Sequence, residues 1–140
     1  VNVLFKMASV LTNYLTDWDI EVIEAHHHRK LDVPSGTALK IGEIISSSLG
    51  TNFEQVVKFG RTKGVNKRQV GKNELGFHSI RAGDIVGDHI ILYAGTGERI
   101  ELKHQAHNRV CFANGAIQAI KFIVEAKKAR IYSTSDVLGL

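Results

Sequence analysis

The only proline of the chain, Pro34, separates its clearest strand pattern from a capped helix pattern. Before it, residues 19–27 (DIEVIEAHH) alternate apolar and polar side chains, which predicts a strand leading into three consecutive histidines. After it, Ser35 is a natural N-cap for a helix over residues 36–49. Any fold of this chain must therefore join a strand end to a helix start through a short connection rich in histidine and basic residues.

The other segments also have readable patterns. Apolar side chains at helical spacing predict helices at residues 2–15 and 112–128, and one short turn is expected around 136–138. The basic, glycine-bearing stretch 60–76 predicts a loop. Short turns separate three further predicted strands, which favours an antiparallel meander over residues 78–82, 85–94 and 99–106.

This order of elements predicts an α+β fold, with a single mixed, largely antiparallel sheet and helices packed on one face. A length of 140 residues corresponds to one domain. Few helices remain to cover the second face of the sheet, so we expect that face to be used in subunit assembly. No apolar run approaches the roughly 20 residues that a membrane-spanning helix needs.

Cysteine content and net charge indicate the cellular location and the kinds of partner that suit this chain. The single cysteine, Cys111, excludes an intramolecular disulfide and favours a reducing, cytoplasmic location. It lies between Val110 and Phe112, which predicts a buried structural thiol. A formal net charge of +4 favours anionic partners, and nucleic acid and small dicarboxylates both fit.

Residues 24–38 (EAHHHRKLDVPSGTA) concentrate groups that can donate protons. If the strand continues to His28, then His26 and His28 share one face and His27 lies on the other. Lys30 follows His26 by four residues, so its flexible side chain can fold back beside an imidazole. Histidine titrates near neutrality and a crowded lysine can have a lowered pKa, so either group can act as a general acid.

The Ser35-Gly36-Thr37 sequence opens the second predicted helix and predicts an anion site. Free backbone N–H groups and the helix dipole attract a carboxylate or phosphate, and Gly36 allows a close approach to the backbone. A chance histidine cluster beside a helix cap that binds no ligand is an equal alternative on these grounds. A metal site is disfavoured, because consecutive histidines in a strand point to opposite faces and clustered cysteines are absent.

The segment EAHHHRKLDVPSGTA resembles the signature of dihydrodipicolinate reductases, Glu-Ala/Leu-His-His-x-x-Lys-x-Asp-x-Pro-Ser-Gly-Thr-Ala, at every fixed position. The resemblance continues through residues 81–89 (RAGDIVGDH), 97–99 (GER) and 112–116 (FANGA). It covers most of the chain and is weak only in the loop at 60–76.

This resemblance implies a function and a role for each matching residue. It implies reduction of an unsaturated cyclic dicarboxylate on the diaminopimelate and lysine pathway, with a hydride from NADH or NADPH. It implies that His26 is the proton donor or electrostatic stabiliser and Lys30 the second general acid. It also implies that His27 contacts the substrate and that Gly36 and Thr37 hold a substrate carboxylate.

The resemblance also implies a nucleotide-binding domain, for which the chain offers no fingerprint. Its only Gly-x-Gly, at residues 95–97, lies between two predicted strands and lacks a third glycine. We therefore expect residues 1–140 to be a C-terminal substrate-binding and oligomerisation domain without the N-terminal dinucleotide-binding domain. Alone, it should be inactive and bind neither NADH nor NADPH. The family's C-terminal domains pack their sheets together, which implies a homotetramer.

Several residues and two other functions remain open. Asp32 is expected to orient Lys30 or cap the turn. Arg81 and Arg109 either neutralise a second carboxylate or are solvated or paired charges. Four further histidines are expected to be structural or at the surface: His78, His89, His104 and His107.

The first alternative function is a basic nucleic-acid-binding module that uses the loop at 60–76. Its cations are Lys63, Lys67, Arg68 and Lys72, but no aromatic side chains are interleaved with them. The second is a structural oligomerisation domain with a vestigial site.

Overall fold

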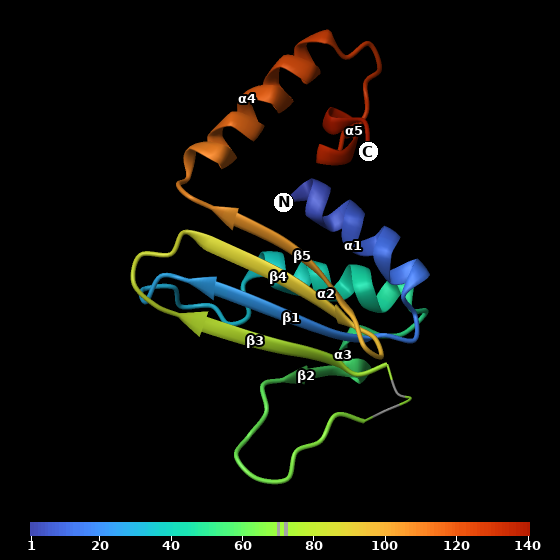
Figure 1. Ribbon diagram of the computed structural model, residues 1–140. Helices are drawn as coiled ribbons and strands as arrows, with labels where there is room; N and C mark the ends of the chain where they lie inside the picture. The colour runs from blue at the N-terminus through green and yellow to red at the C-terminus, as the bar shows by residue number, and fades with distance from the viewer. Residues whose placement is uncertain (70, 72) are drawn as a thin grey trace.

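The computed structural model describes residues 1–69, 71 and 73–140, and these residues form a five-stranded sheet with helices (Figure 1). The elements follow in the order α1 (Asn2–Tyr14), β1 (Asp19–His26), α2 (Gly36–Ser48), α3 (Phe53–Val56), β2 (Val57–Phe59), β3 (Leu75–Arg81), β4 (Gly87–Ala94), β5 (Arg99–Ala106), α4 (Val110–Glu125) and α5 (Thr134–Leu138).

Strand β1 lies at the centre of the sheet, whose order is β2-β3-β1-β4-β5. It pairs in parallel with β3 and antiparallel with β4, while β4 and β5 form an antiparallel hairpin. The predicted mixed sheet is confirmed, but the predicted three-strand meander is wrong, because β1 is inserted between β3 and β4. Ile20 and Val22 lie on one face of β1 and are buried, and Ile23 lies on the opposite face and is partly buried. Such a strand, apolar on both faces, suits a central position in the sheet.

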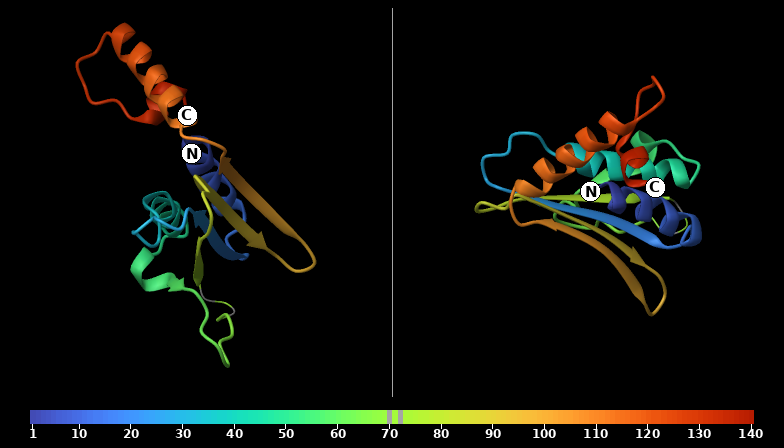
Figure 2. Two further views of the ribbon diagram at one scale, coloured as in Figure 1. Left: turned by 90° about the vertical axis from the view of Figure 1, so that its left-hand side faces the viewer. Right: turned by 90° about the horizontal axis from the view of Figure 1, so that it is seen from above.

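Helices α1 and α2 pack against each other on the same side of the sheet (Figure 2). The core between them and the strands is made of residues such as Leu4, Ala8, Val22, Ile41, Ile45, Phe77, Ile91 and Tyr93. The fully buried Tyr93 hydroxyl donates to the Ala8 carbonyl at 3.1 Å and lies 3.1 Å from the Thr12 hydroxyl. These contacts satisfy a buried polar group and fix α1 to β4.

The start of α2 agrees with the sequence prediction. Ser35 caps it, with its hydroxyl accepting from the Ala38 N–H at 3.2 Å. The sequence did not predict α3 and β2, because elements of four and three residues show no usable periodicity. Strand β3 also begins three residues early, since Leu75 and Phe77 are buried in the core.

Helix α4 is present as predicted but does not pack on the sheet. It extends away from the end of β5, and none of its residues is buried within the described part of the chain (Figure 1). The prediction that Cys111 is buried is therefore wrong, because its helix has no partner layer here. None of the helices among the described residues is long and apolar enough to cross a membrane.

Candidate active site

The carboxyl ends of β1 and β3, the start of β4 and the connection into α2 meet at one edge of the sheet, at the left of Figure 1. Strand β1 ends at His26, whose carbonyl accepts from the Ala82 N–H at 2.9 Å. The next residues leave the strand, and the His28 N–H donates to the Gly83 carbonyl at 3.2 Å. The predicted alternation through His28 is therefore wrong, and this side chain is exposed.

Glu24 and His26 point to the helix-covered face of β1, and both are buried. The His26 Nδ1 and Glu24 Oε2 atoms lie 2.5 Å apart. Arg81 of β3 donates to the two carboxylate oxygens of Glu24 at 2.9 and 2.8 Å. Burial alone would raise the pKa of Glu24, but hydrogen bonds from Arg81, Ser79 and His26 outweigh it and lower the pKa. Glu24 is thus a buried carboxylate held in its ionised form.

Arg81 is committed to this part of the structure. Besides its two bonds to Glu24, it donates to the Asp32 carbonyl at 2.7 Å, so it ties β1 to the connection that follows it. Arg81 is therefore a paired charge, which is one of the roles expected for it from the sequence. Arg109 is different: it is exposed at the start of α4, and its charge contributes to lowering the pKa of His27.

His89 lies in the site, although the sequence indicated only a structural or surface histidine. It is buried on β4, with its Nε2 atom 3.2 Å from the Ser35 hydroxyl. Its ring meets that of His26 edge-on, with the centroids 5.2 Å apart. Burial, followed by the positive charge of His26, lowers the pKa of His89 to about 4. His89 is therefore neutral near pH 7.

The connection after β1 carries His27 and Lys30. The Lys30 ammonium lies 2.8 Å from a carboxylate oxygen of Asp32, which is the contact expected from the sequence, and this bond lowers the pKa of Asp32. Partial burial, then the positive charges of Arg29 and Arg109, lower the pKa of His27. The field around His27 is thus positive and suits an anionic ligand.

The N-terminus of α2 lies beside the buried carboxylate. Glu24 Oε1 accepts from the Ser35 N–H at 3.3 Å, so one carboxylate contacts both His26 and the residue that caps α2. The N–H groups of Gly36 and Thr37 come too early in the helix to have intrahelical acceptors. A Cβ atom at Gly36 would meet no other atom within 4 Å, so this backbone borders open space.

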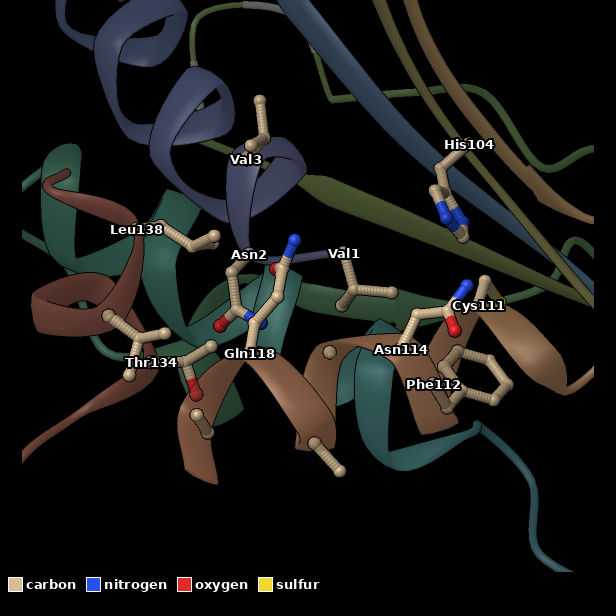
Figure 3. A pocket seen from close by; sticks show the side chains of 14 residues that line it. Val1, Asn2, Val3, His104, Cys111, Phe112, Asn114, Gln118, Thr134 and Leu138 are labelled. Carbon is tan, nitrogen blue, oxygen red and sulfur yellow. The ribbon is translucent and has the colours of Figure 1, made fainter. Parts of the chain in front are cut away.

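A cavity elsewhere in the molecule is lined by other residues. It has a volume of about 620 Å³ and lies between the first turn of α1, α4 and α5, with Val1, Gln118 and Leu138 among its lining residues (Figure 3). His104 and Cys111 are the titratable side chains that line it. Across residues 1–69, 71 and 73–140, no group of three His, Cys, Asp or Glu residues could hold a metal ion.

The two arginines of the basic loop are paired with carboxylates, whereas Lys63 and Lys67 are exposed. The Arg68 Nε atom lies 2.7 Å from Asp19, and its Nη1 atom lies 2.5 Å from Glu21. Arg61 also contacts Glu21, at 3.2 Å. Arg68 is thus paired, which contradicts its predicted role as a phosphate contact. Lys72 lies outside the described residues.

Comparison with known proteins gives concordant results. Residues 1–138 match the protein family described as Dihydrodipicolinate reductase, C-terminus. The whole chain is 48% identical to the 4-hydroxy-tetrahydrodipicolinate reductase of Methanothermobacter thermautotrophicus and 53% identical to that of Methanosarcina barkeri. In both cases it spans 50% of the relative's length.

A solved structure is also similar, the dipicolinate-bound dihydrodipicolinate reductase from Paenisporosarcina sp. TG-14. The two agree with a TM-score of 0.68 at 28% sequence identity, over 90% of this chain and 46% of the other. The chain thus spans about half the length of the relatives that it matches.

Proposed function

The chain belongs to the dihydrodipicolinate reductase family, and from this premise we propose that it is the substrate-binding half of such a reductase. The reaction would be reduction of a cyclic unsaturated dicarboxylate in diaminopimelate and lysine biosynthesis. The observation that carries this proposal is that one buried carboxylate, Glu24, contacts both His26 and the cap of α2. A proton donor and an anion site are thereby adjacent, as protonation of a bound dicarboxylate requires.

In this proposal, the N-terminus of α2 binds one substrate carboxylate. The N–H groups of Gly36 and Thr37 and the Thr37 hydroxyl are the donors, and the helix dipole favours the negative charge. His27 contacts the substrate within the positive field of Arg29 and Arg109. We assign the second carboxylate to Arg109, which is exposed and has no ion-pair partner among the described residues.

We propose that His26 supplies the proton or stabilises the developing negative charge. Its Nδ1 atom is occupied by Glu24, so the Nε2 atom is the end of the ring that faces the reaction. Lys30 is the second general acid. Its ammonium lies on the same connection, where Asp32 contacts it at 2.8 Å.

The Gly-x-Gly of this chain does not have the structure of a dinucleotide-binding fingerprint. The Gly-x-Gly at residues 95–97 forms the turn between β4 and β5, where the Gly95 N–H donates to the Glu98 carbonyl at 3.0 Å. Gly95 packs on Trp18, and a Cβ atom there would lie 2.7 Å from the indole. We therefore assign no cofactor contact to this chain. NADPH or NADH would be held by the part of the relatives' length that the chain does not match.

We further propose that the second face of the sheet mediates assembly into a homotetramer. Ile23, Ile80, Ile90 and Leu92 lie on the face opposite α1 and α2, and Ile80 is 47% exposed. Burial of such a face against other subunits would remove apolar surface from water. Light scattering tests this: a monomer at all concentrations would contradict it.

Two measurements test the proposed function. Isothermal titration of the 140-residue chain with dipicolinate should detect binding, whereas benzoate, with one carboxylate, should bind much more weakly. A chimera that joins the nucleotide-binding half of the Methanothermobacter thermautotrophicus reductase to this chain should oxidise NADPH or NADH in the presence of 4-hydroxy-tetrahydrodipicolinate. A folded chimera without turnover, or a chain that does not bind dipicolinate, would contradict the proposal.

A further inference from the structure

Glu24 is a charged group inside the site, and the proposed reaction gives it neither a proton to transfer nor a contact with the substrate. Glu24 is only 1% exposed, and this charged residue lies on the same strand face as the core residues Ile20 and Val22. Removing a carboxylate and a guanidinium from water costs free energy that their attraction often does not recover. If Glu24 and Arg81 served the fold alone, an apolar pair would serve it as well.

The geometry of Glu24 suggests what the pair does. Arg81 contacts both of its carboxylate oxygens, and this fork fixes the plane of the carboxylate. The Oε2 atom is then 2.5 Å from Nδ1 of His26. Because the carboxylate can only accept a hydrogen bond, Nδ1 carries the proton. A carboxylate held in this way selects one imidazole tautomer and one ring orientation.

We infer that Glu24 is a positioning residue that fixes the tautomer and orientation of His26, with Arg81 holding the carboxylate in place. Only the effect of Glu24 on turnover rests on the proposed function; its effect on the His26 tautomer does not. His26 then presents Nε2 to the substrate in every catalytic cycle. Without Glu24, the ring samples both tautomers and other orientations, and only a fraction of molecules is ready to transfer a proton.

The kinetic test uses a double variant of the chimera, Glu24→Leu with Arg81→Met, which removes both buried charges together and leaves neither unpaired. We expect kcat to fall roughly 10-fold to 100-fold, as for other residues that orient a reactive group. KM should change much less, because the N–H groups of α2 remain.

A matched control is available on α2. Lys40→Met with Glu43→Leu removes an exposed pair separated by 3.0 Å, to which the proposed mechanism gives no role, and should leave kcat unchanged. A folded Glu24→Leu/Arg81→Met chimera with the kcat of the parent would overturn the inference, because the pair would then be only structural.

A second measurement needs no variant of Glu24. In the 140-residue chain, ¹⁵N NMR of the neutral imidazoles should show His26 protonated on Nδ1, with its signal assigned by its loss in His26→Gln. His78 is an internal comparison, since its Nε2 atom lies 2.8 Å from Glu21 and should carry the proton instead. A neutral His26 protonated on Nε2 would overturn the inference, even if the double variant does not fold. A parent chimera without turnover would contradict the proposed function and leave the tautomer result to decide this inference.

Discussion

A Cβ atom at Gly87 would lie 3.1 Å from the Nε2 atom of His26. Gly87 opens β4, and any side chain at this position would meet the imidazole. Nδ1 of the same ring contacts Glu24, so the ring has a carboxylate at one end and, at the other, space that a side chain on Gly87 would fill. The position of the reactive nitrogen therefore depends on the absence of a side chain on β4.

Gly87→Ala should displace His26 by a few tenths of an ångström and lower kcat in the chimera by about tenfold, because proton transfer depends on close placement. Dipicolinate binding should change less. Gly115→Ala in α4 is the control, since a Cβ atom there would meet no other atom within 4 Å. Equal kcat values for the two variants would show that the contact does not position the ring.

Gly36→Ala should separate ligand binding from stability. The added methyl group meets no protein atom within 4 Å, so the midpoint of thermal unfolding should not fall. It would occupy the space beside the N–H groups of α2, and dipicolinate should bind roughly tenfold more weakly, a loss of about 1.4 kcal/mol. Unchanged affinity by isothermal titration would place the carboxylate elsewhere.

Substitutions of the reactive side chains should divide into two kinetic classes. His26→Ala and Lys30→Ala in the chimera should lower kcat by roughly 100-fold or more, the usual contribution of general acid catalysis, with small effects on KM. Thr37→Val keeps the shape but loses the hydroxyl, so it should mainly raise KM. Turnover that survives His26→Ala would show that the proton comes from another group.

His89 should make the chain less stable in mild acid. Its pKa is about 4 in the folded chain, against 6.5 for a free histidine. As the pH falls from 6.5 to about 4, the unfolded chain binds a proton that the folded chain does not, so the free energy of unfolding decreases. The loss approaches roughly 3 kcal/mol at about 1.4 kcal/mol per pKa unit.

Urea unfolding across this pH range would measure the effect. The groups that face His89 are His26, Glu24, His104, Asp88 and the Ser35 hydroxyl. Because the pKa of Glu24 is lowered in the folded chain, protonation of Glu24 also decreases the free energy of unfolding in acid. The comparison must therefore be between two chains that both retain Glu24. His89→Gln should show a shallower decline than the parent chain; equal slopes would mean that His89 is not the titrating group.

Local patterns were sufficient for much of the fold. Ser35 predicted the first residue of α2, because a helix cap is a contact between near neighbours in the sequence. The strand ending at the histidines was correct to within one residue. By contrast, the place of β1 between β3 and β4 depends on pairings such as Glu24 with Ser79 and with His89, which no local pattern encodes.

The same distinction applies to the site. The segment from Glu24 to Ala38 predicts a site from local sequence alone, because its proton donors and helix cap are contiguous. Arg81 and His89 arrive from β3 and β4. Both lie in the resembling segment 81–89, but no local pattern there gave either of them a role in the site. Arg81 proved to be a partner of Glu24 rather than a surface charge, which only the strand register reveals.

The central position of β1 also has a consequence for how the chain acquires its shape. Residues 19–26 are synthesised before their hydrogen-bonding partners, which are residues 75–81 and 88–94. Such non-local pairing has a high contact order, which slows folding because long segments must be closed before the contacts form. On the ribosome, Glu24 and His26 would wait for some seventy more residues, roughly 4 to 14 seconds of synthesis at about 5 to 20 residues per second. Until β3 is made, the strand that carries the proton donor has both edges unpaired, and until β4 is made it has one.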